Sequence, residues 1–174
     1  MKKKQINKQP AYFDRYIEYV PDIDLNDALL QYGFDYLLPE KEKLGQLGHD
    51  VYSPGKWTIR DILQHIIDTE RIFSYRALRI ARNDKTPLPG FDENQYAYVA
   101  HASGRKLDDL FDEFDMVRKS TIFLFDSLSE QDLLREGFIN KSDISVLALG
   151  FTITGHCIHH MNVIKERYYP LIGL

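Results

Sequence analysis

Histidine is the residue type whose number and spacing most clearly indicate chemistry in this sequence. The chain of 174 residues has six histidines but only one cysteine. One cysteine cannot form an internal disulfide or a cysteine-rich zinc site, so a bound transition metal would need ligands from histidines and carboxylates. A metal site is therefore possible only if several histidines meet in the folded chain.

Two histidines stand one helical turn apart in the segment GHCIHH at 155–160. On a helix, His160 lies within about 20° of Ile153 around the axis, and His156 lies about 60° from it. The apolar stripe of that helix consists of Val146, Leu149, Ile153, Cys157 and Ile164. His156 and His160 therefore face the interior together and can bind one metal ion, whereas His159, roughly 120° away, faces a flank. The glutamate of an HExxH zinc-protease motif is missing, so that mechanism is not indicated.

His65 is the best candidate for a third ligand. It lies about 60° from Ile62, at the shoulder of the apolar stripe of its own predicted helix. Asp68 lies on the same shoulder, where its carboxylate could accept a hydrogen bond from an imidazole or act as a base. Arg76 shares the His65 side and could bind an anionic group of a substrate.

These residues also have ordinary structural interpretations. Taken alone, an inward His65 is more typical of a hydrogen-bonded core residue than of a ligand, and the helical pair fits either interpretation. Cys157 lies on the apolar stripe, where a small buried residue is expected rather than a nucleophile. His49 and His101 fall in predicted loops and are expected to face solvent. Only the convergence of three imidazoles favours a metal site.

Long helices must position these side chains. Helical periodicity predicts four of them, at about 24–38, 58–82, 107–128 and 145–168. Thr58 with Asp61 forms a capping-box-like start, and Ser129 opens a further capped turn that a polar loop follows to Asp143. No segment shows a strand pattern. The sequence therefore predicts an all-α, antiparallel four-helix bundle, in one domain over 1–174 with a lead-in at 1–22.

The connection at 85–105, between the second and third helices, is too long for a tight turn. It contains two prolines, two glycines and several aromatic residues. Connections of this length are often functional. Its aromatic side chains Phe91, Tyr96 and Tyr98 are expected to wall the site.

Together these segments resemble the DinB-like (YfiT-like) family of metal-binding four-helix proteins. The resemblance covers most of the chain and is carried by KWTIRDILQHIIDTERIFSYRALRIAR at 56–82, PLPGFDENQYA at 87–97, the helix at 107–128 and GHCIHHMNVIKERY at 155–168. It implies an up-down-down-up bundle with residues 85–105 as its long crossover. It also implies that His65, His156 and His160 bind a divalent metal, nickel or zinc, and that the protein is a homodimer.

The family includes thiol-dependent transferases that use bacillithiol or mycothiol. The resemblance therefore implies a metal-dependent enzyme of thiol transferase or hydrolase type that acts on a small electrophilic molecule. A transferase of this kind would use a low-molecular-weight thiol as co-substrate. Two alternatives stay open: a non-catalytic, metal-stabilised bundle acting as a dimeric binding or stress-response protein, and a plain bundle with buried histidines. A site closed by a fourth protein ligand, Asp68 or His159, would favour a structural role for the metal.

Charge and hydropathy narrow the class of protein. The formal net charge of −4 argues against binding to nucleic acid. No run of about 18 apolar residues is present, so no membrane span is expected. The basic segment MKKKQINKQP lacks the apolar stretch that would follow it in a secretory signal. A cytoplasmic protein that acts on a small molecule is the expectation.

Overall fold

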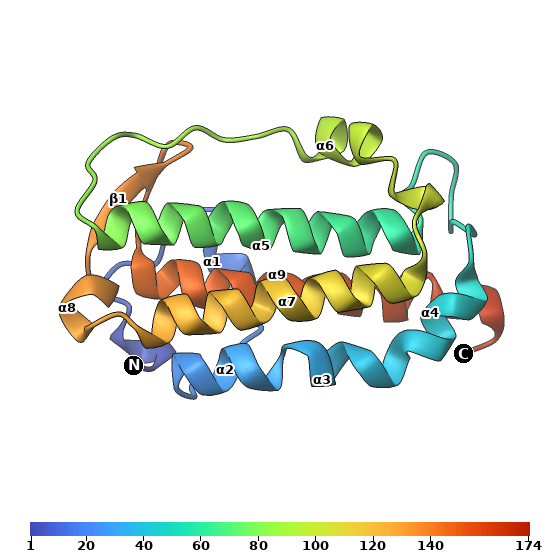
Figure 1. The fold of residues 1–174 in the computed structure, drawn as a ribbon, viewed down its shortest axis with the longest axis horizontal. Helices are drawn as coiled ribbons and strands as arrows, with labels where there is room; N and C mark the ends of the chain where they lie inside the picture. Colours follow the sequence, from blue (N-terminus) through green and yellow to red (C-terminus); the bar gives the residue numbers. More distant parts are fainter.

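The computed structural model describes residues 1–174 and is a four-helix bundle, as the sequence predicts. Its four components are a broken first helix, made of α2 (Leu25–Gln31), α3 (Phe34–Leu37) and α4 (Lys41–Leu47), then α5 (Ile59–Ala81), α7 (Leu107–Asp126) and α9 (Val146–Arg167). Figure 1 shows that the first helix and α9 run in one direction, while α5 and α7 run in the other. Because α5 and α7 are parallel, the chain between them must return along the whole bundle.

The first predicted helix is interrupted near its middle. Asp24 caps α2 by accepting a hydrogen bond from the backbone N–H of Asn26 at 3.0 Å. The break falls at Gly33, where an added Cβ would lie 2.9 Å from the Leu29 carbonyl oxygen. A 3₁₀ turn at Leu38–Glu40 then leads into α4.

Two helix starts are confirmed as predicted. Thr58 and Asp61 form a reciprocal capping box at the start of α5, with hydrogen bonds of 2.9 and 3.2 Å. Ser129 and Asp132 form another at the start of α8 (Glu130–Leu133). Such boxes satisfy N–H groups that the first helical turn leaves free, so they define where a helix begins.

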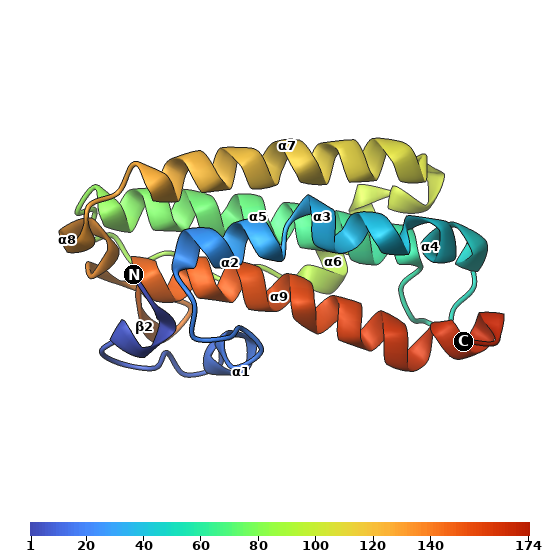
Figure 2. The same cartoon turned by 90° about the horizontal axis from the view of Figure 1, so that it is seen from below.

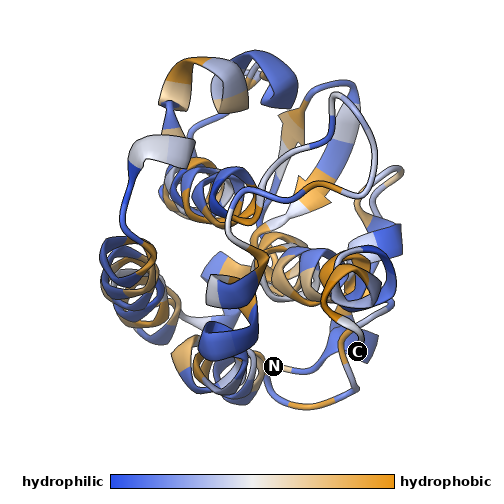
Figure 3. Ribbon diagram, turned by 90° about the vertical axis from the view of Figure 1, so that its right-hand side faces the viewer, coloured by the Kyte–Doolittle hydropathy of each residue, from blue (hydrophilic) through white to orange (hydrophobic).

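Helix α9 is the centre of the bundle. Every residue from Val146 to Ile158 is buried, because α1, α2 and α5 pack around it. A helix enclosed on all sides is apolar all round rather than along one stripe. The view along the bundle in Figure 3 shows the hydrophobic parts of the helices turned toward one another. The predicted stripe of α9 is therefore only part of its buried surface.

A β-hairpin replaces the polar loop predicted before Asp143. Strand β1 (Glu136–Ile139) pairs antiparallel with β2 (Ser142–Ser145). The two turn residues, Asn140 and Lys141, both have positive φ, at 42° and 73°, as the favoured two-residue hairpin turns require. The strands were missed because they are only four residues long and because their turn contains no glycine.

The hairpin holds the long crossover against the bundle. Leu88 donates its N–H to the Phe138 carbonyl at 2.9 Å, and its own carbonyl accepts from Asn140 N–H at 3.2 Å. Beyond this point the crossover contains a short helix that was not predicted, α6 (Glu93–Ala100), capped by Asp92, and a 3₁₀ turn at Ala102–Gly104. Figure 1 shows the crossover passing along α5.

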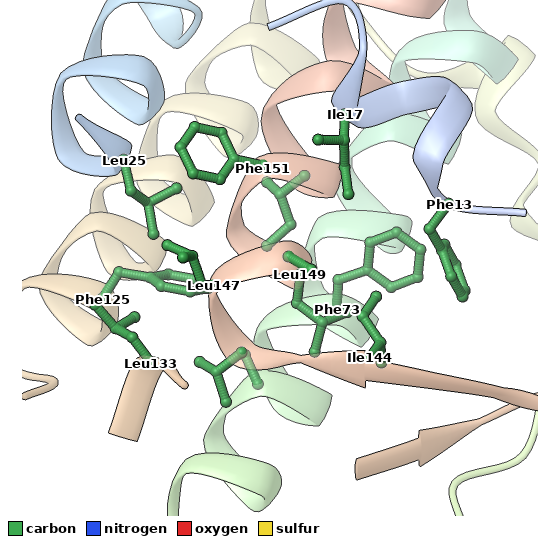
Figure 4. Packing of buried hydrophobic residues seen from close by; sticks show 14 of the residues in the cluster. Phe13, Ile17, Leu25, Phe73, Phe125, Leu133, Ile144, Leu147, Leu149 and Phe151 are labelled. Atoms are coloured by element: carbon green, nitrogen blue, oxygen red, sulfur yellow. The ribbon is translucent and has the colours of Figure 1, made fainter. Parts of the chain in front are cut away.

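The predicted lead-in is part of the core. It begins with a 3₁₀ turn at Lys3–Gln5 and contains α1 (Asp14–Ile17), which packs against α9 (Figure 2). Phe13 and Ile17 are buried among Phe73 of α5 and Leu149 of α9 (Figure 4).

A further 3₁₀ turn at Tyr169–Ile172 ends the fold. None of the helices combines the length and the apolar character that crossing a membrane would require.

Candidate metal site

The three histidines singled out from the sequence meet inside the bundle. The Nε2 atom of His156 lies 3.0 Å from Nε2 of His65 and 3.1 Å from Nε2 of His160. The candidate ligand atoms all lie within 4.8 Å of one another, and no carboxylate or thiol belongs to the cluster. His65 comes from α5 and the other two come from α9, so the contact between these helices assembles the site.

This donor set fits a divalent transition metal. Imidazole nitrogens bound at about 2.0–2.1 Å to one zinc ion lie roughly 3–3.5 Å apart, which is close to the distances of 3.0 and 3.1 Å from Nε2 of His156 to Nε2 of the other two histidines. No carboxylate belongs to the cluster, and none of its three imidazoles takes part in an ion pair. Burial lowers the pKa of His65 to about 4 and the pKa values of His156 and His160 well below the usual value. The rings are therefore neutral near pH 7 and can offer lone pairs to a metal.

Neighbouring side chains hold the imidazoles in place. The Trp57 ring lies 4.8 Å from the His65 ring, and the Tyr16 ring packs edge-on at 5.3 Å against His156. Thr69 places its Oγ1 atom 3.5 Å from Nδ1 of His65, one turn along α5. When Nδ1 of His65 carries the proton and donates it to this hydroxyl oxygen, Nε2 is free to bind a metal.

A cavity of about 210 Å³ opens onto the three histidines. Its aromatic walls come from α1 and the residues before it, from α5, and from the crossover; they are Tyr12, Phe13, Tyr16, Trp57, Phe73 and Phe91. Its charged lining residues are Arg15, Arg76 and Glu93, and Asn140 of the hairpin turn completes the lining. A second cavity of about 270 Å³ shares Trp57 and His160 with the first, so the cluster is reached from two sides. Apolar walls with a few polar groups are typical of small-molecule sites.

Among the predicted wall residues, Phe91 lines the cavity and Tyr96 does not. Tyr96 is 45% exposed and packs against Phe91 from outside, with 5.1 Å between the ring centres. Tyr98 is 76% exposed and lines a separate surface hollow. The reason is the helix α6, which was not predicted: it places Tyr96 in a separate hollow against α5 and leaves Tyr98 exposed.

Asp68 is not brought to the cavity. Its carboxylate accepts a hydrogen bond from the Gln64 side chain at 2.9 Å and lies on the side of α5 that faces Arg71. Burial raises the pKa of this carboxyl. The side chain beside His65 is that of Thr69, because Thr69 is four residues from His65 and one turn returns to the same face.

Arg76, on the His65 side of α5, lines the cavity. It is buried, and its Nη2 atom donates to the carbonyl of Pro89 at 2.5 Å. His159 lies beside the cluster without joining it, with its ring between Tyr16 and Tyr19. Neither Asp68 nor His159 therefore supplies a fourth protein ligand.

The remaining histidines and the cysteine lie as the sequence analysis expects. His49 and His101 are exposed. Cys157 is fully buried, and burial raises the pKa of its thiol to about 12, so it stays protonated. None of these three side chains takes part in the cluster.

Sequence reasoning missed the wall that the N-terminal segment supplies. Tyr12, Arg15 and Tyr16 line the cavity, with the Arg15 guanidinium 3.9 Å from the Tyr12 ring centre. The spacing of aromatic residues in YFDRYIEY at 12–19 was the available signal, because it places Tyr12, Tyr16 and Tyr19 on one side of a helical turn. Only the docking of this segment on α9 shows that the side is turned toward the histidines.

Known proteins share sequence or fold with this chain. The family model of the DinB superfamily matches residues 4–164. A protein of Oceanobacillus iheyensis, provisionally named a metal-dependent hydrolase, is 26% identical over 117 residues. That match covers 66% of this chain and 66% of the relative, slightly less than two thirds of each.

A solved structure shares the fold. YfiT from Bacillus subtilis, described as a probable metal-dependent hydrolase with an unusual four-helix bundle topology, superimposes with a TM-score of 0.67. The alignment covers 91% of this chain and 87% of YfiT at 15% sequence identity. Because the family model spans nearly the whole chain and the fold agrees, the chain belongs to the DinB superfamily.

Proposed function

We propose that this protein is a metal-dependent enzyme, in the first place a hydrolase, that acts on a small electrophilic molecule. The observation that carries the proposal is the convergence of three neutral imidazoles at the wall of an open cavity. Three histidine ligands with an open position are typical of catalytic metal sites, whereas structural sites are closed by a fourth protein ligand. The names of the relatives from Oceanobacillus iheyensis and Bacillus subtilis support the same reaction class.

The residues of this chain have distinct roles in the proposal. His65, His156 and His160 would hold a divalent ion, zinc or nickel, whose Lewis acidity makes water or a thiol a nucleophile near neutral pH. Thr69 and Trp57 keep the His65 ring in its orientation. The aromatic walls exclude bulk water around the reacting groups, which strengthens electrostatic interactions there.

Thiol transfer is the second reaction that the same site supports. The cavity admits a small thiol as readily as water, and an imidazole-bound transition metal stabilises a thiolate. In that reaction a low-molecular-weight thiol is the co-substrate and its sulfur attacks the electrophile in place of water. A purely structural metal is the less favoured alternative, because Asp68 and His159 do not close the site.

Metal analysis tests the site itself. The full chain, purified without a polyhistidine tag, is expected to hold about one divalent ion per chain. His160→Ala is expected to lose that ion, because it removes one of the three Nε2 donors. His159→Ala is the matched control, since it removes a neighbouring imidazole outside the cluster and should keep the metal. Equally negligible metal in the wild type and in His160→Ala would contradict the proposal.

Two probe reactions separate the reaction classes. Hydrolysis of 4-nitrophenyl acetate reports water as the nucleophile, and conjugation of cysteine with 1-chloro-2,4-dinitrobenzene, which releases chloride, reports a thiol. Metal-loaded wild type should accelerate one of them, and the chelator-treated protein and His160→Ala should not. A metal-loaded protein that holds its ion but accelerates neither reaction would favour the structural alternative.

A further inference from the structure

Two arginines are buried in this bundle, and their surroundings differ. Arg118 is 2% exposed and donates two hydrogen bonds of 2.8 Å to the carboxylate of Glu70. Arg76 is 5% exposed and forms no ion pair; its one hydrogen bond is donated by Nη2 to the Pro89 carbonyl. Glu93 lines the same cavity as Arg76, but no ion pair joins the two side chains. Arg76 is thus a buried cation without a protein anion.

The Arg76 guanidinium is held in a defined place with donors to spare. The ring of Phe73 on α5 lies 5.4 Å from it, and the ring of Phe91 on the crossover lies 5.7 Å from it. Its Nε and Nη1 atoms have no acceptor in the protein, and neither atom is sealed from the surrounding space. Arg76 lines the histidine cavity and also a hollow between α5 and the crossover, so the free donors of the guanidinium fork remain available to a ligand in the space beside it.

An unpaired buried cation is costly, and a bound anion would offset that cost. Desolvation disfavours the charged form, and burial indeed lowers the pKa of Arg76. An arginine still stays charged at neutral pH, so the missing partner is an anion rather than a lost proton. One buried positive charge matches a monoanion, and the planar fork matches the geometry of a carboxylate.

The anion would reach the same cavity as the histidines. Arg76 follows His65 by eleven residues on α5, an axial rise of about 16 Å, but both line one cavity, and Phe73 lies between them with its ring 5.4 Å from the Arg76 guanidinium and 6.4 Å from the His156 ring. Asn140 lines the cavity as well, and its side-chain amide makes no hydrogen bond within the protein. Its contact with Gly90 places it beside the crossover that carries Phe91.

We propose that the substrate of this site is a small carboxylate whose carboxylate group binds Arg76, with the reacting group directed toward the three imidazoles and an apolar part between the aromatic walls. The assignment of the reacting end rests on the proposed metal-dependent function. The anion position does not, because none of the groups that form it belongs to the histidine cluster.

Binding of matched ligands tests the proposal. The probes are 3-phenylpropanoate and its uncharged amide, 3-phenylpropanamide, titrated by calorimetry into the full chain, both metal-loaded and chelator-treated. The chelator-treated arm prevents the carboxylate from binding a metal instead. Wild type is expected to prefer the carboxylate by about tenfold, the size of one charge-assisted hydrogen-bonded contact.

Substitutions on α5 test whether Arg76 causes the preference for the carboxylate over the amide. Arg76→Gln should abolish it, and Arg76→Lys, which keeps the charge and loses the fork, should retain part of it. Arg79→Gln is the matched control, because Arg79 lies on the same helix but pairs with Asp84 outside the cavity. Circular dichroism verifies that each variant is folded, and Arg76→Lys keeps the test decisive if Arg76→Gln does not fold.

Other results of the same titrations would contradict the proposal. A wild type with no preference for the carboxylate, or with no binding of it, would overturn the proposal, and so would an Arg76→Gln variant that keeps the preference. His160→Ala should leave the preference intact in the chelator-treated protein. A failure of metal binding and a failure of anion recognition are therefore seen in different variants.

Discussion

At the scale of single residues, the contact between α1 and α9 depends on one missing side chain. Gly155 lies directly before His156, and a Cβ added there would lie 1.9 Å from the carbonyl oxygen of Tyr16. A backbone atom cannot move aside as the end of a flexible side chain can. Gly155 therefore allows the N-terminal segment to approach α9 closely enough to wall the cavity with Tyr16.

We expect Gly155→Ala to lower the free energy of unfolding by about 2–3 kcal/mol, because the added methyl group must displace α1. Denaturant unfolding measures the change. Gly45→Ala is the matched control within a helix: its Cβ would lie 3.6 Å from Leu107, an ordinary contact, so it should gain about 0.5–1 kcal/mol from helix propensity. Equal effects of the two substitutions would show that the close approach to Tyr16 does not matter.

At the scale of elements, a buried arginine joins three helices where the first helix breaks. Arg118 of α7 donates to the carbonyl oxygens of Leu29 and Tyr32 at 3.0 and 2.8 Å and to Glu70 of α5. These carbonyls lie at the end of α2 and have lost their helical partners at the break. Arg118 thus supplies hydrogen bonds to carbonyl groups that the break at Gly33 leaves without helical partners inside the bundle, and Glu70 balances its charge.

Glu70→Gln should destabilise the protein by about 3 kcal/mol, because it leaves the charge of Arg118 buried and uncompensated. Thermal or denaturant unfolding measures the loss. Glu113→Gln is the comparison, since Glu113 pairs with the more exposed Arg71 and Arg105 and should cost about 1 kcal/mol or less. A loss below 1 kcal/mol for Glu70→Gln would contradict a role for this pair in holding the three helices together.

A second polar group, Glu40, joins the segment before α4 to the C-terminal end of the chain at one end of the bundle. Glu40 accepts hydrogen bonds from Tyr169 at 2.7 Å and Lys43 at 2.9 Å, and pairs with Lys165 of α9 at 3.1 Å. Burial alone would raise the pKa of this carboxyl, but these partners outweigh burial and lower the pKa to about 2. The folded state therefore favours the ionised carboxylate.

This shift makes one part of the stability dependent on pH. Because the pKa is lower in the folded than in the unfolded chain, Glu40 stabilises the fold above its usual pKa and loses that contribution as the pH falls toward 2. Glu40→Gln should cost about 1–2 kcal/mol at pH 7. Urea unfolding of both proteins from pH 7 to pH 3 should show the difference shrinking once the pH drops below about 4.5. A difference that stays constant with pH would sink this assignment.

At the scale of the whole molecule, burial is uneven in a way that matters for the cavity. The first half of α9 is enclosed on every side, whereas α6 of the crossover has no buried residue. The crossover is fixed to the hairpin only near Leu88, and it supplies Phe91 and Glu93 to the cavity lining. One wall of the cavity therefore belongs to the core, whereas the other belongs to the crossover, whose helix α6 has no buried residue.

Amide hydrogen exchange should reveal this gradient. Residues 146–158 of α9 are expected to exchange only through global unfolding, whereas residues 93–100 of α6 should exchange through local opening, with protection lower by about a hundredfold or more. Mass spectrometry of peptides, or NMR, measures both segments in one experiment. Protection of α6 as strong as that of α9 would mean that the crossover is part of the cooperative core.

The fold was predictable to a large extent because its signals are local. The helix predicted at 58–82 is observed at Ile59–Ala81, since a capping box defines its start and an apolar stripe its buried face. His156 and His160 could be paired from their spacing alone, and His65 from its position beside an apolar stripe. A hairpin of two four-residue strands and the helix α6 escaped prediction, because neither has a periodic pattern long enough to recognise.

The sequence by itself determined an all-α bundle, the inward direction of three imidazoles and the absence of a cysteine-based site, because periodicity, caps and composition act within a few residues. Only the tertiary structure decided that neither Asp68 nor His159 joins the cluster, that the N-terminal segment walls the cavity, and that Arg76 is buried without a protein anion. Those features depend on segments far apart in the chain, such as Tyr16 against Gly155, and on the space their side chains leave.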